Sequence, residues 1–75
     1  MANVITDFDL LIEKIRDSGM TIVAIAQKTG IDRATFYNRL KGVGEFSASE
    51  IVAISEVLNL SKPDRDKIFL TKSVN

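Results

Sequence analysis

Apolar residues recur along this chain with the spacing of amphipathic helices rather than the alternation of strands. The first apolar stripe, at i, i+3, i+4 and i+7, predicts a helix that ends near Ser18 and stops at Gly19. Thr6 is expected to cap the start of this helix. Asp7 and Asp9 follow in the first turn, where the helix dipole favours negative charge. The members of the stripe are Phe8, Leu11, Ile12 and Ile15.

Three further helices are predicted at about 21–29, 33–41 and 48–59, each with a polar residue where an N-cap belongs. Thr21 and Asp32 are the expected caps of the first two, and Ser47 forms a capping box with Glu50 for the third. The apolar stripes of these helices are Ile22, Ile25 and Ala26; Phe36 and Leu40; and Ile51, Ile54 and Leu58.

A short fifth helix is predicted after Ser61, since a proline such as Pro63 is tolerated in a first helical turn. It is expected to carry Ile68, Phe69 and Leu70 and to fray into a polar tail. No β alternation and no internal repeat is apparent. The pattern therefore predicts an all-α fold of five short helices, one domain over residues 1–75 with frayed tails at 1–5 and 71–75.

The connection between the second and third helices has the pattern of a helix-turn-helix. Ala26 is small enough for close approach of two helix axes, and Gly30 can take the left-handed conformation that ends a helix. Ile31 can enter the core from the turn, and Phe36 is placed to pack back on the second helix. A generic helical hairpin that only packs a core remains the alternative.

Charge along the chain is segregated, although ten Lys and Arg residues balance ten Asp and Glu residues. A neutral chain is unusual for a nucleic-acid binder, because a basic surface supplies most of the affinity. The predicted third helix nevertheless lies in a positive block, since residues 28–41 hold four cations against the single carboxylate of Asp32. These cations are Lys28, Arg33, Arg39 and Lys41.

Composition argues against several classes of protein. The chain has no cysteine and no histidine, so a disulfide framework, a transition-metal site and histidine acid–base catalysis are not expected. A domain of this size also has little volume for a carboxylate pocket. We therefore expect no enzyme, no cofactor and no small-molecule substrate. Neither a signal peptide nor a membrane span is apparent, so we expect a cytoplasmic protein.

Residues 21–42, TIVAIAQKTGIDRATFYNRLKG, resemble the helix-turn-helix of the Cro/repressor-type (λ-repressor-like, XRE) family. Residues 35–60 resemble small prophage-encoded regulators of Gram-positive bacteria, and the likeness covers roughly residues 6–70. The resemblance implies a five-helix DNA-binding domain of a transcriptional regulator, acting in a bacterial cell or phage-infected host. In that family the third helix enters the major groove, and two subunits bind a two-fold symmetric operator. The chain departs from the family in its neutral charge and in reading Arg39-Leu40 where many members place the apolar residue one position earlier.

By the same resemblance, base edges are contacted by Arg33, Ala34 and Asn38. Arginine can bind guanine in a bidentate way, asparagine can bind adenine, and an alanine methyl can contact the thymine methyl. Tyr37 is a further candidate for DNA contact, but it could equally cover the edge of the core.

Phosphate contacts are expected from both ends of the motif. Thr21 lies at a helix N-terminus, where free N–H groups attract anions, and Lys41 precedes the loop that begins at Gly42. Lys28 and Thr35 are further candidates, although Lys28 could be merely solvated and Thr35 could bond to the helix backbone. Arg39 could join them or pair with a nearby carboxylate of Glu45 or Glu50, and we favour the ion pair.

The sequence indicates a homodimer patch and allows a second function besides DNA reading. Three consecutive apolar residues cannot all face inward on a helix, so Phe69 or Leu70, with Val74, is expected to form part of a homodimer patch. The alternative to DNA reading is a protein-interaction module on a helix-turn-helix scaffold, which would modulate another repressor. Zero net charge and the exposed Tyr37 favour that alternative.

Overall fold

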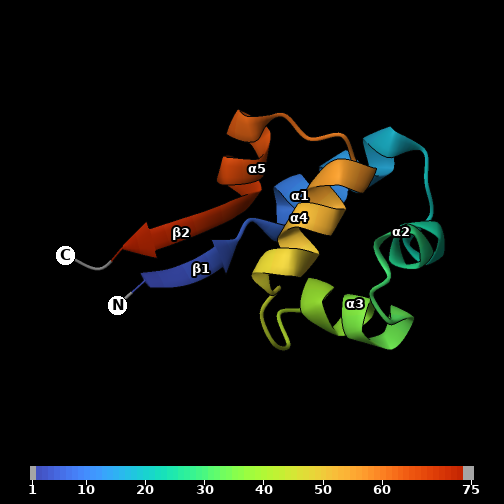
Figure 1. Cartoon of the computed structure of the whole chain (residues 1–75), viewed down its shortest axis with the longest axis horizontal. Coiled ribbons are helices and arrows are strands. Elements are labelled where there is room, and N and C mark those ends of the chain that lie inside the picture. Colours follow the sequence, from blue (N-terminus) through green and yellow to red (C-terminus); the bar gives the residue numbers. More distant parts are fainter. Residues whose placement is uncertain (1, 74–75) are drawn as a thin grey trace.

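A computed structural model of the chain describes the backbone of residues 2–73 and the side chains of residues 6–69. Within this part the chain forms one strand, then five helices, then a second strand (Figure 1). In chain order the elements are β1 (Ala2–Thr6), α1 (Phe8–Ser18), α2 (Ile22–Thr29), α3 (Arg33–Leu40), α4 (Ala48–Val57), α5 (Lys62–Ile68) and β2 (Phe69–Ser73).

The five predicted helices are confirmed, and local hydrogen bonds explain where each one begins. The Thr21 hydroxyl accepts from the Ala24 N–H at 3.0 Å, and Ser47 and Glu50 form both bonds of the capping box. The prediction for α1 is wrong by one residue. Asp7, not Thr6, is its N-cap, because the carboxylate accepts from the N–H of the third helical residue while Thr6 belongs to β1.

The two strands were not predicted. The fifth helix ends at Ile68 rather than continuing through Leu70, and β2 pairs antiparallel with β1 in the register Ala2↔Ser73 to Thr6↔Phe69. Strands therefore occupy residues 2–5 and 71–73, where the sequence predicted frayed tails. The Asp7 N–H donates to the Ile68 carbonyl at 2.7 Å. This bond joins the start of α1 to the end of α5, directly next to the two paired strands.

Three aromatic rings link the elements of the core. Phe36 of α3 packs edge-on against Phe46, with ring centroids 6.0 Å apart, and Phe46 packs edge-on against Phe69 at 5.7 Å. All three side chains are buried, together with Leu11 and Ile54 at the centre of α1 and α4. The further buried apolar residues are Ile15, Ile25, Ala26, Ile31 and Ile68.

This core corrects one predicted apolar position and decides between two alternatives at another. Ile12, placed in the first stripe, is 39% exposed, because the buried side of α1 is centred on Leu11 and Ile15. Phe69, one of the two alternatives named for a dimer patch, is only 6% exposed and packs on Phe46, so it closes the core beside Ile68. The helix ends at Ile68 and β2 begins at Phe69, so the helical period no longer sets the direction of the Phe69 side chain. Both consecutive residues can therefore be buried. The Leu70 and Val74 side chains lie outside the described part.

Within residues 2–73, no helix is both long enough and apolar enough to cross a membrane.

Candidate nucleic-acid interface

The joint between α2 and α3 is built as the sequence predicts. Gly30 ends α2 with φ +76°, in the left-handed region that favours glycine. Ile31 follows it into the core at 8% exposure, and Ala26 is buried at 3%. The Thr29 hydroxyl donates to the Ile25 carbonyl at 2.9 Å and accepts from the Ile31 N–H at 3.3 Å, which fixes the turn from both sides.

The start of α3 is fixed by Asp32. One carboxylate oxygen accepts from the N–H groups of Ala34 at 3.1 Å and Thr35 at 3.3 Å. These bonds satisfy two of the donors that the first turn of a helix leaves without an intrahelical partner. The Asp32 side chain is itself exposed, so a negative charge lies at the exposed N-terminus of α3.

The two sides of α3 differ sharply in burial. Phe36 is fully buried and Leu40 is half-buried, and these two residues hold the helix to the core. The four predicted base-contact residues are all exposed, with Tyr37 at 40%. They are Arg33, Ala34, Tyr37 and Asn38. In Figure 1, α3 lies at the edge of the molecule opposite α5.

The predicted phosphate residues lie in several different settings. Lys28 and Lys41 are exposed, and Thr21 is exposed at the N-terminus of α2, with its hydroxyl oxygen capping the helix. Thr35 is half-buried and lines a cleft of about 390 Å³ between the α2–α3 turn and the start of α4. Thr35 therefore lies toward α4 rather than on the open side of α3.

The Gly42 N–H, on which a phosphate contact was expected, is already used within the protein. It donates to the Arg39 carbonyl at 3.0 Å, and the next N–H, of Val43, donates to the Asn38 carbonyl at 2.8 Å. These bonds close the C-terminal end of α3, with Gly42 at φ +87°. The Gly42 N–H therefore has a partner at the helix end, and a phosphate contact at Gly42 stays a prediction.

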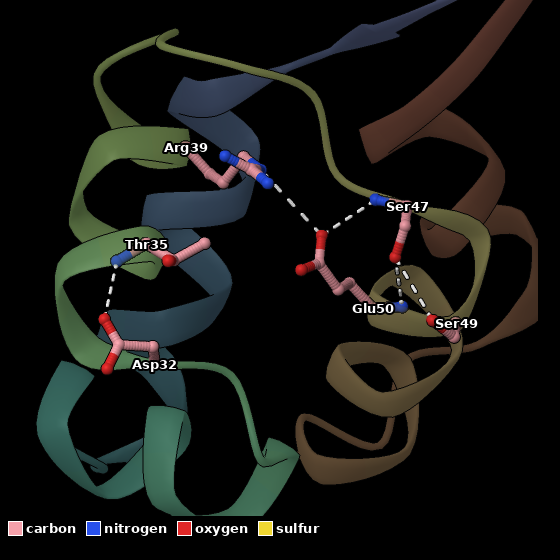
Figure 2. A network of polar contacts seen from close by, with 6 residues as sticks. All are labelled: Asp32, Thr35, Arg39, Ser47, Ser49 and Glu50. Atoms are coloured by element: carbon pink, nitrogen blue, oxygen red, sulfur yellow. Dashed lines mark hydrogen bonds and ion pairs between the residues drawn. The ribbon is translucent and has the colours of Figure 1, made fainter.

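Arg39 forms an ion pair with a carboxylate, which is the alternative favoured from the sequence. Its Nε lies 3.8 Å from Oε1 of Glu50, and the two side chains are only 25% and 21% exposed (Figure 2). The sequence could name Glu45 and Glu50 as candidate partners but could not choose between them, because the choice depends on the path of the intervening loop. The exposed cations of the block are then Lys28, Arg33 and Lys41.

Comparison with known proteins agrees with this geometry. A family model described as helix-turn-helix (HTH_3) matches residues 12–64, which run from the first half of α1 into α5 and include the whole α2–α3 joint. No curated protein and no solved structure matches the chain significantly.

Proposed function

This chain belongs to the XRE/λ-repressor-like helix-turn-helix family of DNA-binding transcription regulators, and from that premise we propose that it is a sequence-specific, Cro-like regulator. It binds operator DNA with α3 in the major groove and controls transcription by occupying that site. The single observation that carries the proposal is the exposed side of α3, held in place by the fully buried Phe36. The likeness of residues 35–60 to prophage regulators supports a phage-type role.

Base reading is assigned to Arg33, Ala34 and Asn38, with Tyr37 beside them. A bidentate arginine–guanine or asparagine–adenine pair contributes ~1–3 kcal/mol of discrimination against the wrong base. All four side chains are exposed on one short helix, which matches the reach of a recognition helix into one groove.

Positioning on the duplex is assigned to phosphate contacts on either side of α3. Thr21 and the N-terminus of α2 supply an anion-attracting helix end, and the exposed Lys28 and Lys41 supply charge. Thr35 is the weaker candidate, because its half-buried side chain lies toward α4. Such contacts orient the protein but do not read sequence.

The regulator is proposed to act as a homodimer on a two-fold symmetric operator. One short recognition helix contacts only a few base pairs, so a second copy doubles the information read. Helix-turn-helix dimers bind half-sites about 34–36 Å apart, which is one turn of the double helix.

A protein-interaction module remains the second candidate, and one observation favours it. The formal charge is zero, and the pairing of Arg39 with Glu50 removes one of the four cations of residues 28–41 from the exposed surface. In that role the domain would pair with another regulator and bind DNA only weakly.

The two candidates are separated by the salt dependence of DNA binding. We expect the protein to select a preferred duplex from a random library. With about 6–10 phosphate contacts in the dimer, its affinity for that duplex should fall ~10³–10⁵-fold between 50 and 200 mM salt. A duplex of the same composition and shuffled sequence is the control. Weak binding to both duplexes, without this steep dependence, would instead support the interaction module.

A further inference from the structure

Arg39 extends from α3 toward Glu50 in the first turn of α4 (Figure 2). Its Nε is shielded from solvent and lies 3.8 Å from Glu50 Oε1, which is beyond hydrogen-bond distance. The pair is therefore held by the attraction of two partly buried charges, which solvent screens less than it would at an open surface.

Glu50 joins this arginine to the cap of α4. The same oxygen, Oε1, accepts from the Ser47 N–H at 2.8 Å, while the Ser47 hydroxyl accepts from the Glu50 N–H at 3.2 Å. One carboxylate thus contacts both α3 and the first turn of α4. Because the capping box fixes its rotamer, Glu50 is a rigid anchor for the guanidinium.

The loop between α3 and α4 is shaped around the same guanidinium. Gly44 has φ +77°, and a Cβ atom at this position would lie 2.5 Å from Arg39 Nη1. A Cβ at residue 44 would therefore displace the guanidinium from its place against the backbone. At Gly42, which also has a positive φ, a Cβ would meet no atom within 4 Å.

We infer that Arg39 is a positioning residue, which fixes the orientation of α3 and the path of residues 42–46 against α4 without contacting DNA. This inference rests on the proposed function, because it concerns how the DNA-reading helix is held. An eight-residue helix has few anchors, and here the apolar anchors are Phe36 and Leu40 on one side. Arg39 adds a polar anchor on another side, next to the Asn38 and Lys41 that are proposed to bind DNA.

Two substitutions remove the ion pair from opposite ends. Arg39→Met keeps an unbranched apolar stem without the guanidinium and its charge, and Glu50→Gln keeps an oxygen that can accept from Ser47 N–H. If Arg39 positions α3, both variants lose ~5–150-fold in affinity for the duplex selected by the unaltered protein, as for a misplaced base contact. Binding to the shuffled duplex and the salt slope stay unchanged.

A phosphate contact by Arg39 would give a different result. Arg39→Met would then weaken both duplexes and lower the salt slope by about one, while Glu50→Gln would free the guanidinium and tighten binding. Either pattern overturns the inference, as does unchanged binding by both variants. Circular dichroism establishes that each variant is folded, and Arg39→Gln, which also removes the charge, serves if Arg39→Met is not.

A measurement on the free protein keeps this inference separate from the proposed function. We expect faster hydrogen exchange at the Gly42 and Val43 amides in both variants, because these N–H groups close the loop that Arg39 holds. The Arg39 Nε–H resonance should move in Gly44→Ala but not in the matched, equally strained Gly42→Ala. Unchanged exchange and an unmoved resonance would contradict the positioning role even if the unaltered protein reads DNA. Failure of the unaltered protein to select any duplex would count against the proposed function alone.

Discussion

Two arginines of α3 have different surroundings, although they are only six residues apart. Arg33 is exposed next to the capping Asp32, whose carboxylate is bound to backbone N–H groups. Arg39 lies against Gly44 and faces Glu50. Among the described residues, the guanidinium of Arg39 is paired with a carboxylate near the end of the helix, whereas Arg33 is exposed at its start. This contrast makes Arg33, rather than Arg39, the arginine to test for base reading.

Substitution of Arg33 and of Lys41 should separate base reading from phosphate binding. We expect Arg33→Ala to relax the preference at one base pair of the half-site, at a cost of ~1–3 kcal/mol. Lys41→Ala should weaken all sequences alike and lower the salt slope by about one for each phosphate that is no longer neutralised. Binding to a set of duplexes with single base changes, at several salt concentrations, measures both effects.

Lys62→Ala is the control for removal of a charge, because α5 lies on the opposite side of the molecule from α3 (Figure 1). It should leave the base preference unchanged. Equal weakening of every duplex by Arg33→Ala would mean that Arg33 contacts only phosphate.

At the scale of elements, features set by neighbouring residues could be predicted and those set by distant ones could not. The caps at Thr21, Asp32 and Ser47 depend on residues two or three positions away, so their sequence patterns suffice. The exposed side of α3 follows from the helical period once Phe36 is placed in the core. The strands depend on pairing between the two ends of the chain, and each contributes only five residues.

The cap of α3 offers a test in which charge and capping are separated. Asp32→Asn keeps a side-chain acceptor, and asparagine caps about as well as aspartate, so stability should change by less than ~0.5 kcal/mol. Removing the exposed negative charge should tighten binding to all duplexes, because phosphates no longer face a carboxylate. Asp32→Ala should instead lose ~0.5–2 kcal/mol of unfolding free energy. Chemical denaturation and DNA titration measure the two effects.

Ser61→Ala is the matched removal of a cap, at the start of α5. It should reduce stability by a similar amount without changing DNA preference. If Asp32→Asn weakens binding to the selected duplex alone, the carboxylate itself contacts a base, as it can with the cytosine amino group.

On the scale of the whole molecule, the two ends of the chain pair as β1 and β2, and neither strand includes a residue of α3. In Figure 1, α5 lies at the edge opposite α3, and the paired strands project to one side. A further contact joins α1 to α5 here, since Lys14 Nζ lies 3.1 Å from Asp64 Oδ2. Neither residue could be paired from the sequence, because the contact depends on the packing of the first helix against the last. This arrangement allows stability to be altered at one side while the reading side is kept.

The Lys14–Asp64 pair gives the fold a pH dependence whose direction follows from its chemistry. The hydrogen bond to Lys14, together with the charge of that lysine, lowers the pKa of Asp64, and the same contact raises the pKa of Lys14. The Asp64 contribution is therefore complete above the unfolded pKa of about 3.9 and is lost as pH falls through the lower folded value. The Lys14 contribution is complete below its unfolded pKa of about 10.4 and is lost as pH rises through the raised value.

We therefore expect Asp64→Asn to lower the Tm at neutral pH, with a difference from the unaltered protein that shrinks as the solution is acidified below about pH 4. Thermal unfolding followed by circular dichroism across this range measures the difference. Asp66→Asn is the control, because Asp66 is 57% exposed and its pairs with Lys62 and Arg65 are longer, at 3.7 and 3.6 Å. Solvent screens such exposed pairs, so this substitution should change the Tm less. A Tm difference for Asp64→Asn that persists unchanged in acid would mean that the aspartate stabilises α5 by packing or capping, not through its charge on Lys14.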